Sequence, residues 1–420
     1  MNMELGRYSF GMGDRFARQG VAQLRAVKRS VGDGYEITPV WNKSHREHMT
    51  IGSVPADVRA EADAAVAELG WEGAYFVDAD HINLKTVGLF MVSSDFFTLD
   101  VADRIGSTAS EEDVAAFVDR HSDLVGDHAL PGSDAGFSIS KEDLREAAGK
   151  YLLAVKEARK IYTSIRNAKG EGTFVTEVSL DEAEEPQSPK ELLVILAALA
   201  DAGIPLDTIA PRFSGRFDKG VDYVGDVEVF AAEFDADAAV LELAVEMFGL
   251  PDGVKLSVHS GSDKFSIYPA IKEVLVRRGA GLHLKTSGTT WLEEVVGLAE
   301  SGGEALETVK AVYFKSLDKM DELCEPYAAV IDINPINLPS KEEVEAWDGD
   351  RFAAALRHVP SNGRYNSDMR QLLHVGYKVA AGMGKAYIDL LAEHADTIAK
   401  HVETNIADRH VRKLFPKRKG

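Results

Sequence analysis

The chain has 420 residues, of which 45% are hydrophobic, and it carries a formal net charge of −21. This size suits one large domain or two ordinary ones, and an α/β barrel with insertions fits as a single domain over residues 1–420. The negative charge argues against nucleic-acid binding and against binding to an anionic membrane surface.

Cysteine usage and the absence of long apolar runs indicate the compartment. Cys324 is the single cysteine, which excludes an intrachain disulfide and a thiolate metal cluster and suits a reducing environment. The segment MNMELGRYSFGMG has no apolar signal region, and no run of about 18 apolar residues occurs. We therefore expect a cytoplasmic protein without a membrane partner; a homo-oligomer is compatible with the sequence.

Short apolar or β-branched runs alternate with helical patterns along the chain, which is typical of βα units around a parallel sheet. Helical patterns include 55–70, 227–249 and 188–203, the last with Ser188 as its N-cap, Pro189 at its first position and Gly203 at its end. Eight strands are predicted, at 7–13, 35–41, 73–80, 172–180, 206–213, 254–260, 280–288 and 327–334. This count favours a (β/α)8 TIM-barrel-like fold over an open sheet.

Two segments stand outside this alternation. Residues 107–167 are helical and acidic, and we interpret them as a helical insertion after the third strand, with a lid or a subunit contact as its candidate roles. The basic stretch VRKLFPKRKG at 411–420 is interpreted as a short solvated tail.

Charged and polar residues follow five of the predicted strands. In parallel α/β folds, functional groups collect at the carboxyl ends of the strands. These strand exits supply Asp78, Asp80, His81 and Lys85; Glu177, Asp181 and Glu182; Arg212, Arg216 and Lys219; His259, Ser260, Asp263 and Lys264; and His283, Lys285, Thr286 and Ser287.

Three of the exit residues are histidines. A lone histidine at a strand end is more often structural, but His81, His259 and His283 come from exits that would converge in a barrel. Imidazole and carboxylate ligands favour Zn²⁺, Mn²⁺, Co²⁺ or Ni²⁺. We predict that these three histidines hold one divalent metal ion. In the alternative, one histidine only orients a neighbour, and Glu177 or Asp80 completes the ligand set.

The carboxylates of Asp80 and Glu177 are predicted to act as a proton-transfer pair, one on each side of the substrate. Glu177 lies inside the apolar run TFVTEVSL, so a core-facing carboxylate there needs a partner. A structural salt bridge from Glu177 to Arg212 or Lys285 is the alternative. Asp80 and His81 are adjacent, and they can serve one site only if the strand has ended there.

Small residues in SGSDK (260–264) and KTSGTT (285–290) are suited to cradling an anion. With basic side chains nearby, they predict an acidic sugar or a sugar phosphate as substrate. The predicted substrate-binding residues are Arg212, Ser260, Asp263, Lys264, Lys285, Thr286, Ser287 and His374.

Five motifs together resemble the tagaturonate epimerases: FVDADHINLKTV, FVTEVSLDEAEEPQSP, APRFSGRFDKGVDYVGD, KLSVHSGSDKFSIYP and GLHLKTSGTTWLE. The resemblance spans roughly residues 9–378 and is most specific in HSGSDKFSIYP and HLKTSGTT. It implies a metal-dependent enzyme of hexuronate breakdown that interconverts tagaturonate and fructuronate. The helical insertion and the C-terminal tail do not contribute to it.

The implied reaction inverts a carbon β to the ketone, whose proton the carbonyl does not acidify. One route is retro-aldol cleavage, rotation of the aldehyde and re-addition, with a metal stabilising the enediolate. Transient oxidation by a bound nicotinamide is less favoured, because no dinucleotide-binding fingerprint is present.

Two other functions remain open. A class I aldolase or another barrel sugar isomerase would use Lys264 or Lys285 as a Schiff base on an acidic sugar. A non-catalytic sugar-acid-binding protein would have stacking aromatic residues and little need for three histidines at strand exits.

Overall fold

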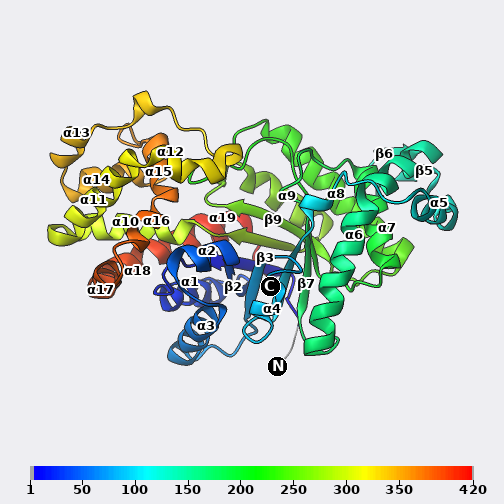
Figure 1. The fold of residues 1–420 in the computed structure, drawn as a ribbon, viewed down its shortest axis with the longest axis horizontal. Coiled ribbons are helices and arrows are strands. Elements are labelled where there is room, and N and C mark those ends of the chain that lie inside the picture. Colours follow the sequence, from blue (N-terminus) through cyan, green and yellow to red (C-terminus); the bar gives the residue numbers. More distant parts are fainter. Residues whose placement is uncertain (1–3, 419–420) are drawn as a thin grey trace.

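The computed structural model describes residues 4–418. Eight parallel strands close into a barrel in the order β1-β10-β9-β8-β7-β4-β3-β2 (Figure 1). They are β1 (Tyr8–Gly13), β2 (Thr38–Ser44), β3 (Phe76–Ile82), β4 (Phe96–Asp100), β7 (Val175–Ser179), β8 (Thr208–Ala210), β9 (Lys255–Gly261) and β10 (Leu282–Thr286). The predicted TIM-barrel-like fold is confirmed.

One barrel strand was missed and one predicted strand is wrong. β4 follows β3 through the single-turn helix α4 (Val87–Phe90), a connection too short to give the helical pattern that separates strands elsewhere. The predicted eighth strand at 327–334 begins instead within the 3₁₀ helix η4 (Glu325–Val330), where Tyr327 is buried. A short apolar run cannot be assigned to a strand or a buried helical turn by periodicity alone.

Helices cover the outside of the barrel (Figure 1). The predicted patterns at 55–70, 188–203 and 227–249 form α3, α7 and α8, and Ser188 caps α7 in a capping box with Glu191. The helices that follow barrel strands include α1 (Gly20–Gly32), α2 (His45–Ile51), α3 (Pro55–Leu69), α6 (Lys141–Lys169), α7 (Pro189–Asp201), α8 (Val227–Phe248), α9 (Tyr268–Arg278) and α10 (Thr289–Ser301).

The segment interpreted as a helical insertion follows the fourth barrel strand, not the third, because β4 precedes it. It contains α5 (Glu111–Arg120), an antiparallel hairpin of β5 (Gly126–Ala129) and β6 (Gly136–Ile139), and α6. The long helix α6 packs against α7 and β4, so it serves as the barrel helix between β4 and β7. Only α5 and the hairpin project outward, at one end of the molecule (Figure 1).

A larger helical region follows α10 and forms the opposite end of the molecule (Figure 1). The chain then returns to the barrel, where α18 packs against α10 and α1, and the π-helix η6 packs against α1. The elements of this region are α11 (Gly303–Asp318), α12 (Met320–Cys324), η4, η5 (Pro335–Asn337), α13 (Lys341–Glu345), α14 (Gly349–Leu356), α15 (Ser367–Val375), α16 (Tyr377–Ala381), α17 (Lys385–Glu393), α18 (Ala395–Glu403), η6 (Thr404–Val411) and α19 (Arg412–Leu414).

The interpretation of 411–420 as a solvated tail is wrong for residues 411–415, which include buried side chains. Val411, Leu414 and Phe415 are fully buried, because their apolar side chains complete the core that η6 and α19 share with α9 and α1. Residues 419–420 lie outside the described residues. Among residues 4–418, the structure has no helix long and apolar enough to span a membrane.

The barrel interior changes from apolar to charged along the strands. Side chains two apart on a strand face the same side, and a separate cluster of Leu5, Val40, Phe76, Phe96 and Val175 fills one end of the interior. Further along the same inward-facing side of each strand, toward its carboxyl end, β3 carries Asp78 and Asp80, and β7 carries Glu177. The interior polar groups therefore gather at the carboxyl end of the barrel.

Candidate active site

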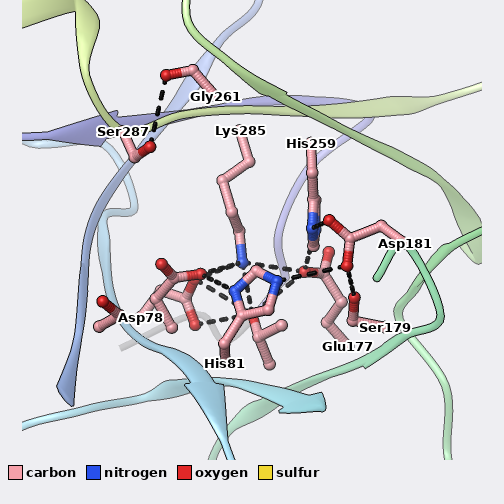
Figure 2. A network of polar contacts seen from close by, with 12 residues as sticks. Asp78, His81, Glu177, Ser179, Asp181, His259, Gly261, Lys285 and Ser287 are labelled. Carbon is pink, nitrogen blue, oxygen red and sulfur yellow. Dashed lines mark hydrogen bonds and ion pairs between the residues drawn. The ribbon is translucent and has the colours of Figure 1, made fainter. Parts of the chain in front are cut away.

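A buried ammonium group lies at the centre of the polar network. Lys285 Nζ lies 2.8 Å from Asp78 Oδ2 and 3.0 Å from both Asp80 Oδ1 and Glu177 Oε1 (Figure 2). Thr98 Oγ1 also accepts a hydrogen bond from this ammonium at 2.5 Å. Since β10, β3, β4 and β7 supply these groups, the network joins β10 to three strands that are not its neighbours in the barrel.

The charges in this network fix the protonation of most of its members. Burial alone would lower the pKa of Lys285, but Asp78, Glu177 and Asp80 raise that pKa well above its usual value. Burial alone would raise the pKa of Asp80 and of Glu177, yet the Lys285 ammonium and neighbouring histidines hold both pKa values low. For Asp78, burial dominates and raises the pKa to about 7. Lys285 is therefore a fixed cation and not a free amine.

The backbone at His81 breaks the alternation of β3. His81 has a φ of 50°, in the left-handed region that non-glycine residues seldom occupy, and the pairing of β3 with β4 shifts between Ala79 and Ile82. In a regular strand Asp80 and His81 would face opposite sides. Here His81 Nδ1 lies 2.7 Å from Asp80 Oδ1, so both side chains serve the same site. Backbone strain of this kind clusters at functional sites.

Two histidines and a carboxylate form a group that could hold a metal ion. Donor atoms of His81, Asp181 and His259 all lie within 4.8 Å of one another. His81 Nε2 lies 3.3 Å from Asp181 Oδ1, and His259 Nδ1 lies 2.9 Å from Asp181 Oδ2 (Figure 2). His259 Nδ1 is buried, and Asp181 is the carboxylate beside it. Two imidazoles and a carboxylate suit Zn²⁺ and similar ions.

The far ring nitrogen of each histidine has its own carboxylate. His81 Nδ1 is paired with Asp80, and His259 Nε2 lies 2.8 Å from Glu177 Oε1. Ser179 Oγ in turn donates to Asp181 Oδ1 at 2.5 Å. Carboxylates that hold the second nitrogen of a histidine fix its tautomer and ring orientation at metal sites.

The same carboxylates affect the charge of the imidazoles. Burial would lower the pKa of His81 and of His259, but Asp80 and Asp181 raise the pKa of His81, and Asp181 chiefly raises that of His259. Burial would raise the pKa of Asp181, whereas the two histidines lower it. The pocket thus favours positive charge between these three side chains, which a divalent ion would also supply.

His283, the third predicted metal ligand, lies outside this group. It is fully buried inside the barrel, its Nδ1 lies 2.9 Å from Ser9 Oγ, and its ring packs on Phe96 at 5.2 Å between centroids. Burial lowers its pKa to about 3. His283 precedes Lys285 by two residues on the same face of β10, so it lies deeper in the barrel than the strand exits. The group that could hold a metal ion contains Asp181, and not His283, beside His81 and His259.

The predicted proton-transfer pair is not arranged as expected. Asp80 and Glu177 both contact the Lys285 ammonium, each at 3.0 Å, so this group lies between the two carboxylates. Both oxygens of Glu177 are engaged, Oε1 by His259, Lys285 and Thr98 and Oε2 by Thr208 at 2.7 Å. Asp80 lines a cavity and uses only Oδ1 in its contacts with His81 and Lys285. The alternative of a Glu177–Lys285 salt bridge is what the structure has.

A cavity of about 290 Å³ is lined by His81, Asp181 and His259, and a second cavity of about 320 Å³ adjoins it. Both are lined by Asp181, His259 and Lys219. These volumes are at the small end for ligand sites and suit a sugar. His81, Asp181 and His259 therefore face a space where a small polar molecule can bind.

Basic and neutral polar groups line the same space. Arg15 is paired with Glu47 and lies over the Tyr377 ring at 4.4 Å, and Arg46 lies over the Tyr327 ring at 5.2 Å. His374 is buried and its Nε2 has no hydrogen-bond partner among residues 4–418. Burial and surrounding cations hold the pKa of His374 well below its usual value, so it is a neutral imidazole.

The predicted substrate-binding residues divide into two sets. Lys285, Ser287 and His374 line the first cavity and Arg212 lines the second. The others face away from both, each bound within the protein: Ser260 Oγ to the Lys285 carbonyl, Thr286 Oγ1 to the Gly11 carbonyl, Lys264 Nζ to the Asp218 and Val221 carbonyls, and Asp263 to Arg370, His358 and His410.

Several residues of the site were not assigned to it from the sequence. Asp181 and Lys219 were noted at strand exits, but the acidic loop around Asp181 gave no reason to prefer one carboxylate. Arg15, Arg46 and Tyr327 line the first cavity from the loop after β1, from α2 and from the distant η4. Only the closed barrel and the returning C-terminal region bring these segments together.

Comparison with known proteins places the chain in a family. Residues 1–414 match the model of a family described as tagaturonate epimerase. A Thermotoga maritima protein named tagaturonate/fructuronate epimerase is 28% identical over 421 residues, which cover 95% of this chain and 80% of that protein.

Solved structures agree in fold. The glycerol-bound crystal structure of fructuronate-tagaturonate epimerase from Cohnella laeviribosi has a TM-score of 0.80 at 23% identity, covering 97% of this chain and 81% of that one. The native structure of that protein has a TM-score of 0.77 with the same coverage. Because the family model spans nearly the whole sequence, this chain belongs to the tagaturonate epimerase family.

Proposed function

We propose that this chain interconverts tagaturonate and fructuronate and that His81, Asp181 and His259 hold a divalent metal ion for this reaction. The observation that carries the metal proposal is the convergence of donor atoms of His81, Asp181 and His259, which lie within 4.8 Å of one another and line one cavity. Family membership carries the choice of substrate. Asp80 and Glu177 support the site by orienting the two histidines.

The two sugars differ at the carbon β to the ketone, so we propose retro-aldol cleavage and re-addition. The hydroxyl on that carbon loses its proton, the bond between the α and β carbons breaks, and an aldehyde forms while the electron pair stays on the α carbon. The aldehyde turns over and the bond re-forms on its other face. A bound divalent ion would withdraw electrons from the ketone and hydroxyl oxygens of the sugar.

Asp80 is the carboxylate we assign to carry the proton. Its Oδ1 is held by His81 and Lys285, and these contacts leave Oδ2 to the cavity that Asp80 lines. The low pKa of Asp80, which Lys285 causes against the effect of burial, keeps it ionised, the form that can take up a proton. The same carboxyl returns the proton after the bond re-forms. Glu177, whose oxygens are both engaged, acts as a positioning residue.

The Schiff-base route has less support. Lys285 is kept protonated by three carboxylates, and a protonated amine is not a nucleophile. Lys264 is fully buried and binds backbone carbonyls instead of facing a cavity.

The experiment is conversion of tagaturonate by the purified protein, followed by NMR, with elemental analysis of bound metal. Chelation should abolish conversion, and His81→Ala, Asp181→Ala and His259→Ala should each lose stoichiometric metal. Glu177→Gln should weaken metal affinity by about 10–100-fold. His283→Asn is the matched control and should keep its metal.

Each result has a counterpart that contradicts the proposal. A chelated protein that remains fully active is not metal-dependent, and a variant with full metal occupancy removes its residue from the ligand set. A metal-loaded protein that leaves tagaturonate unchanged does not have the proposed function.

A further inference from the structure

Two cations line both cavities without a side-chain hydrogen bond or ion pair among residues 4–418: Arg46, which lies over the Tyr327 ring, and Lys219. Lys219 lies on the loop between β8 and α8. Among residues 4–418 its Nζ has no hydrogen bond or ion pair, whereas Lys285 is held by three carboxylates and Arg15 is paired with Glu47. A lysine ammonium has three donors to satisfy. Lys219 therefore has its binding capacity free for a molecule in the cavity.

Three buried side chains form hydrogen bonds with the backbone on both sides of Lys219. Ser262 Oγ accepts from the Gly220 N–H at 3.0 Å, and Arg370 donates to the Gly220 carbonyl. Lys264 Nζ donates to the carbonyls of Asp218 at 3.1 Å and Val221 at 2.8 Å. Ser262, Lys264 and Arg370 are 0% exposed. We call these three residues the loop clamp.

The loop clamp places two buried basic side chains against backbone carbonyls on either side of Lys219: Arg370, whose charge Asp263 balances, and Lys264, whose pKa burial lowers to about 7. Burying charged groups is costly unless they are well hydrogen-bonded, so a loop with only a connecting role gives no reason for this arrangement. A fixed backbone reduces the ordering cost when a flexible lysine binds a ligand. The clamp is thus suited to presenting Lys219 in one position.

Around Lys219, the nearby carboxylates do not offset the effects of burial and of the neighbouring cations. Burial lowers the pKa of Lys219, Arg15 and Arg46 lower it further, and Glu182 and Asp181 only partly oppose them. Across Lys219, Gly261 has a φ of +64°, and a Cβ there would lie 3.5 Å from Nζ. Backbone without a side chain therefore leaves room beside the amine. A carboxylate placed there would satisfy the donors and offset the repulsion between cations.

We propose that Lys219 binds the carboxylate of the hexuronate, and that Ser262, Lys264 and Arg370 are the positioning residues for it. This inference rests on the proposed function. In the retro-aldol step the aldehyde fragment is the one that carries the carboxylate. An anchored carboxylate would keep this fragment in the cavity while its aldehyde turns over and before the carbon–carbon bond re-forms.

Steady-state kinetics of the metal-loaded enzyme on tagaturonate and on the neutral ketohexose tagatose test the proposal. Lys219→Met should raise KM for tagaturonate by about 100-fold, as expected for loss of a charge-assisted hydrogen bond in a partly desolvated site. KM for tagatose should change less than about threefold, and Lys219→Arg should recover part of the tagaturonate affinity. The matched control is Lys85→Met, which removes the same charge from an exposed position. Equal effects of Lys219→Met on both sugars would overturn the proposal.

A binding measurement separates this inference from the proposed reaction. Calorimetric titration with D-galactonate and with uncharged galactitol requires no turnover. The wild type should bind galactonate at least tenfold more tightly than galactitol, and Lys219→Met should lose this preference while keeping its metal content and melting temperature. If tagaturonate is not converted but the preference depends on Lys219, the proposed reaction fails and the anion site stands. If Lys219→Met keeps the preference, the anion site is wrong.

Discussion

At the residue scale, the interior histidines differ because of their depth in the barrel. His81 and His259 lie at the level of the cavity, with carboxylates on both ring nitrogens. His283 lies deeper, and burial dominates its environment, with Glu177 only partly opposing it. Histidine is thus charged or suited to binding a ligand at the mouth of the barrel, and neutral deeper in the barrel interior.

The neutral state of His283 predicts a pH-dependent stability. Burial lowers its pKa to about 3 in the folded protein, whereas the unfolded value is about 6.5. Between these values the unfolded chain binds more protons, so the contribution is present above pH 6.5 and is lost as the pH falls. In urea unfolding of metal-free protein, the stability advantage of wild type over His283→Asn should shrink by about 1.4 kcal/mol per pH unit below pH 6.5.

His48 and His401 also have pKa values lowered to about 4, chiefly by burial, so the difference between wild type and variant is the quantity to measure. A difference that stays constant from pH 7.5 to pH 5 would show that His283 is not held neutral.

At the element scale, the exit of β9 carries both the metal-ligand candidate His259 and the support for Lys219. Ser260 and Ser262 are both fully buried there, but Ser260 Oγ donates to the Lys285 carbonyl while Ser262 Oγ accepts from Gly220 and Lys264. The two serines thus offer a matched pair, one outside the loop clamp and one within it.

Ser262→Ala should raise KM for tagaturonate by about 3–10-fold, because loss of one buried acceptor leaves two donors unsatisfied, at a cost of about 1–3 kcal/mol. The change in kcat should be smaller, since His81, Asp181 and His259 are untouched. Ser260→Ala is the control, and kinetics on tagaturonate and tagatose is the measurement. A larger KM effect from Ser260→Ala than from Ser262→Ala would contradict the role of the clamp.

Periodicity and strand-exit chemistry were enough to predict the barrel, seven of its strands and some of the polar residues at its mouth. They could not predict β4, because the connection through α4 is a single turn. They could not distinguish His283 from the ligand candidates either, because depth along a barrel strand depends on register with its neighbours. Asp263 and Lys264 also looked like site residues, since sequence alone does not tell which way a strand exit turns.

At the scale of the whole molecule, Asp263 joins distant segments beneath the site. Its Oδ2 lies 2.9 Å from Arg370 Nη2 and 3.2 Å from His358 Nδ1, and its Oδ1 lies 3.0 Å from His410 Nε2. The carboxylate is fully buried. It connects the exit of β9 to the region after α10 and to η6.

Asp263→Asn should lower the free energy of unfolding by about 3–5 kcal/mol, because it leaves the buried Arg370 guanidinium without its counter-charge. Denaturant unfolding measures this change. Asp235→Asn, which affects a partly exposed carboxylate paired with Arg277 and Arg278, should cost only about 0–1 kcal/mol. Similar losses in the two variants would mean that the buried network is not a main source of stability.

The Asp263 network also bears on the order in which the site is completed during synthesis. His410 lies 147 positions after Asp263 and Asn405 lies 142 positions after it. The barrel strands leave the ribosome earlier, but a buried carboxylate without these partners is unfavourable. A nascent chain that stops before η6 would therefore contain all eight strands and every metal-ligand candidate. Its Asp263, at the exit of β9, would still lack the partners His410 and Asn405. Catalytic competence would arise only when the chain has been translated through residue 410.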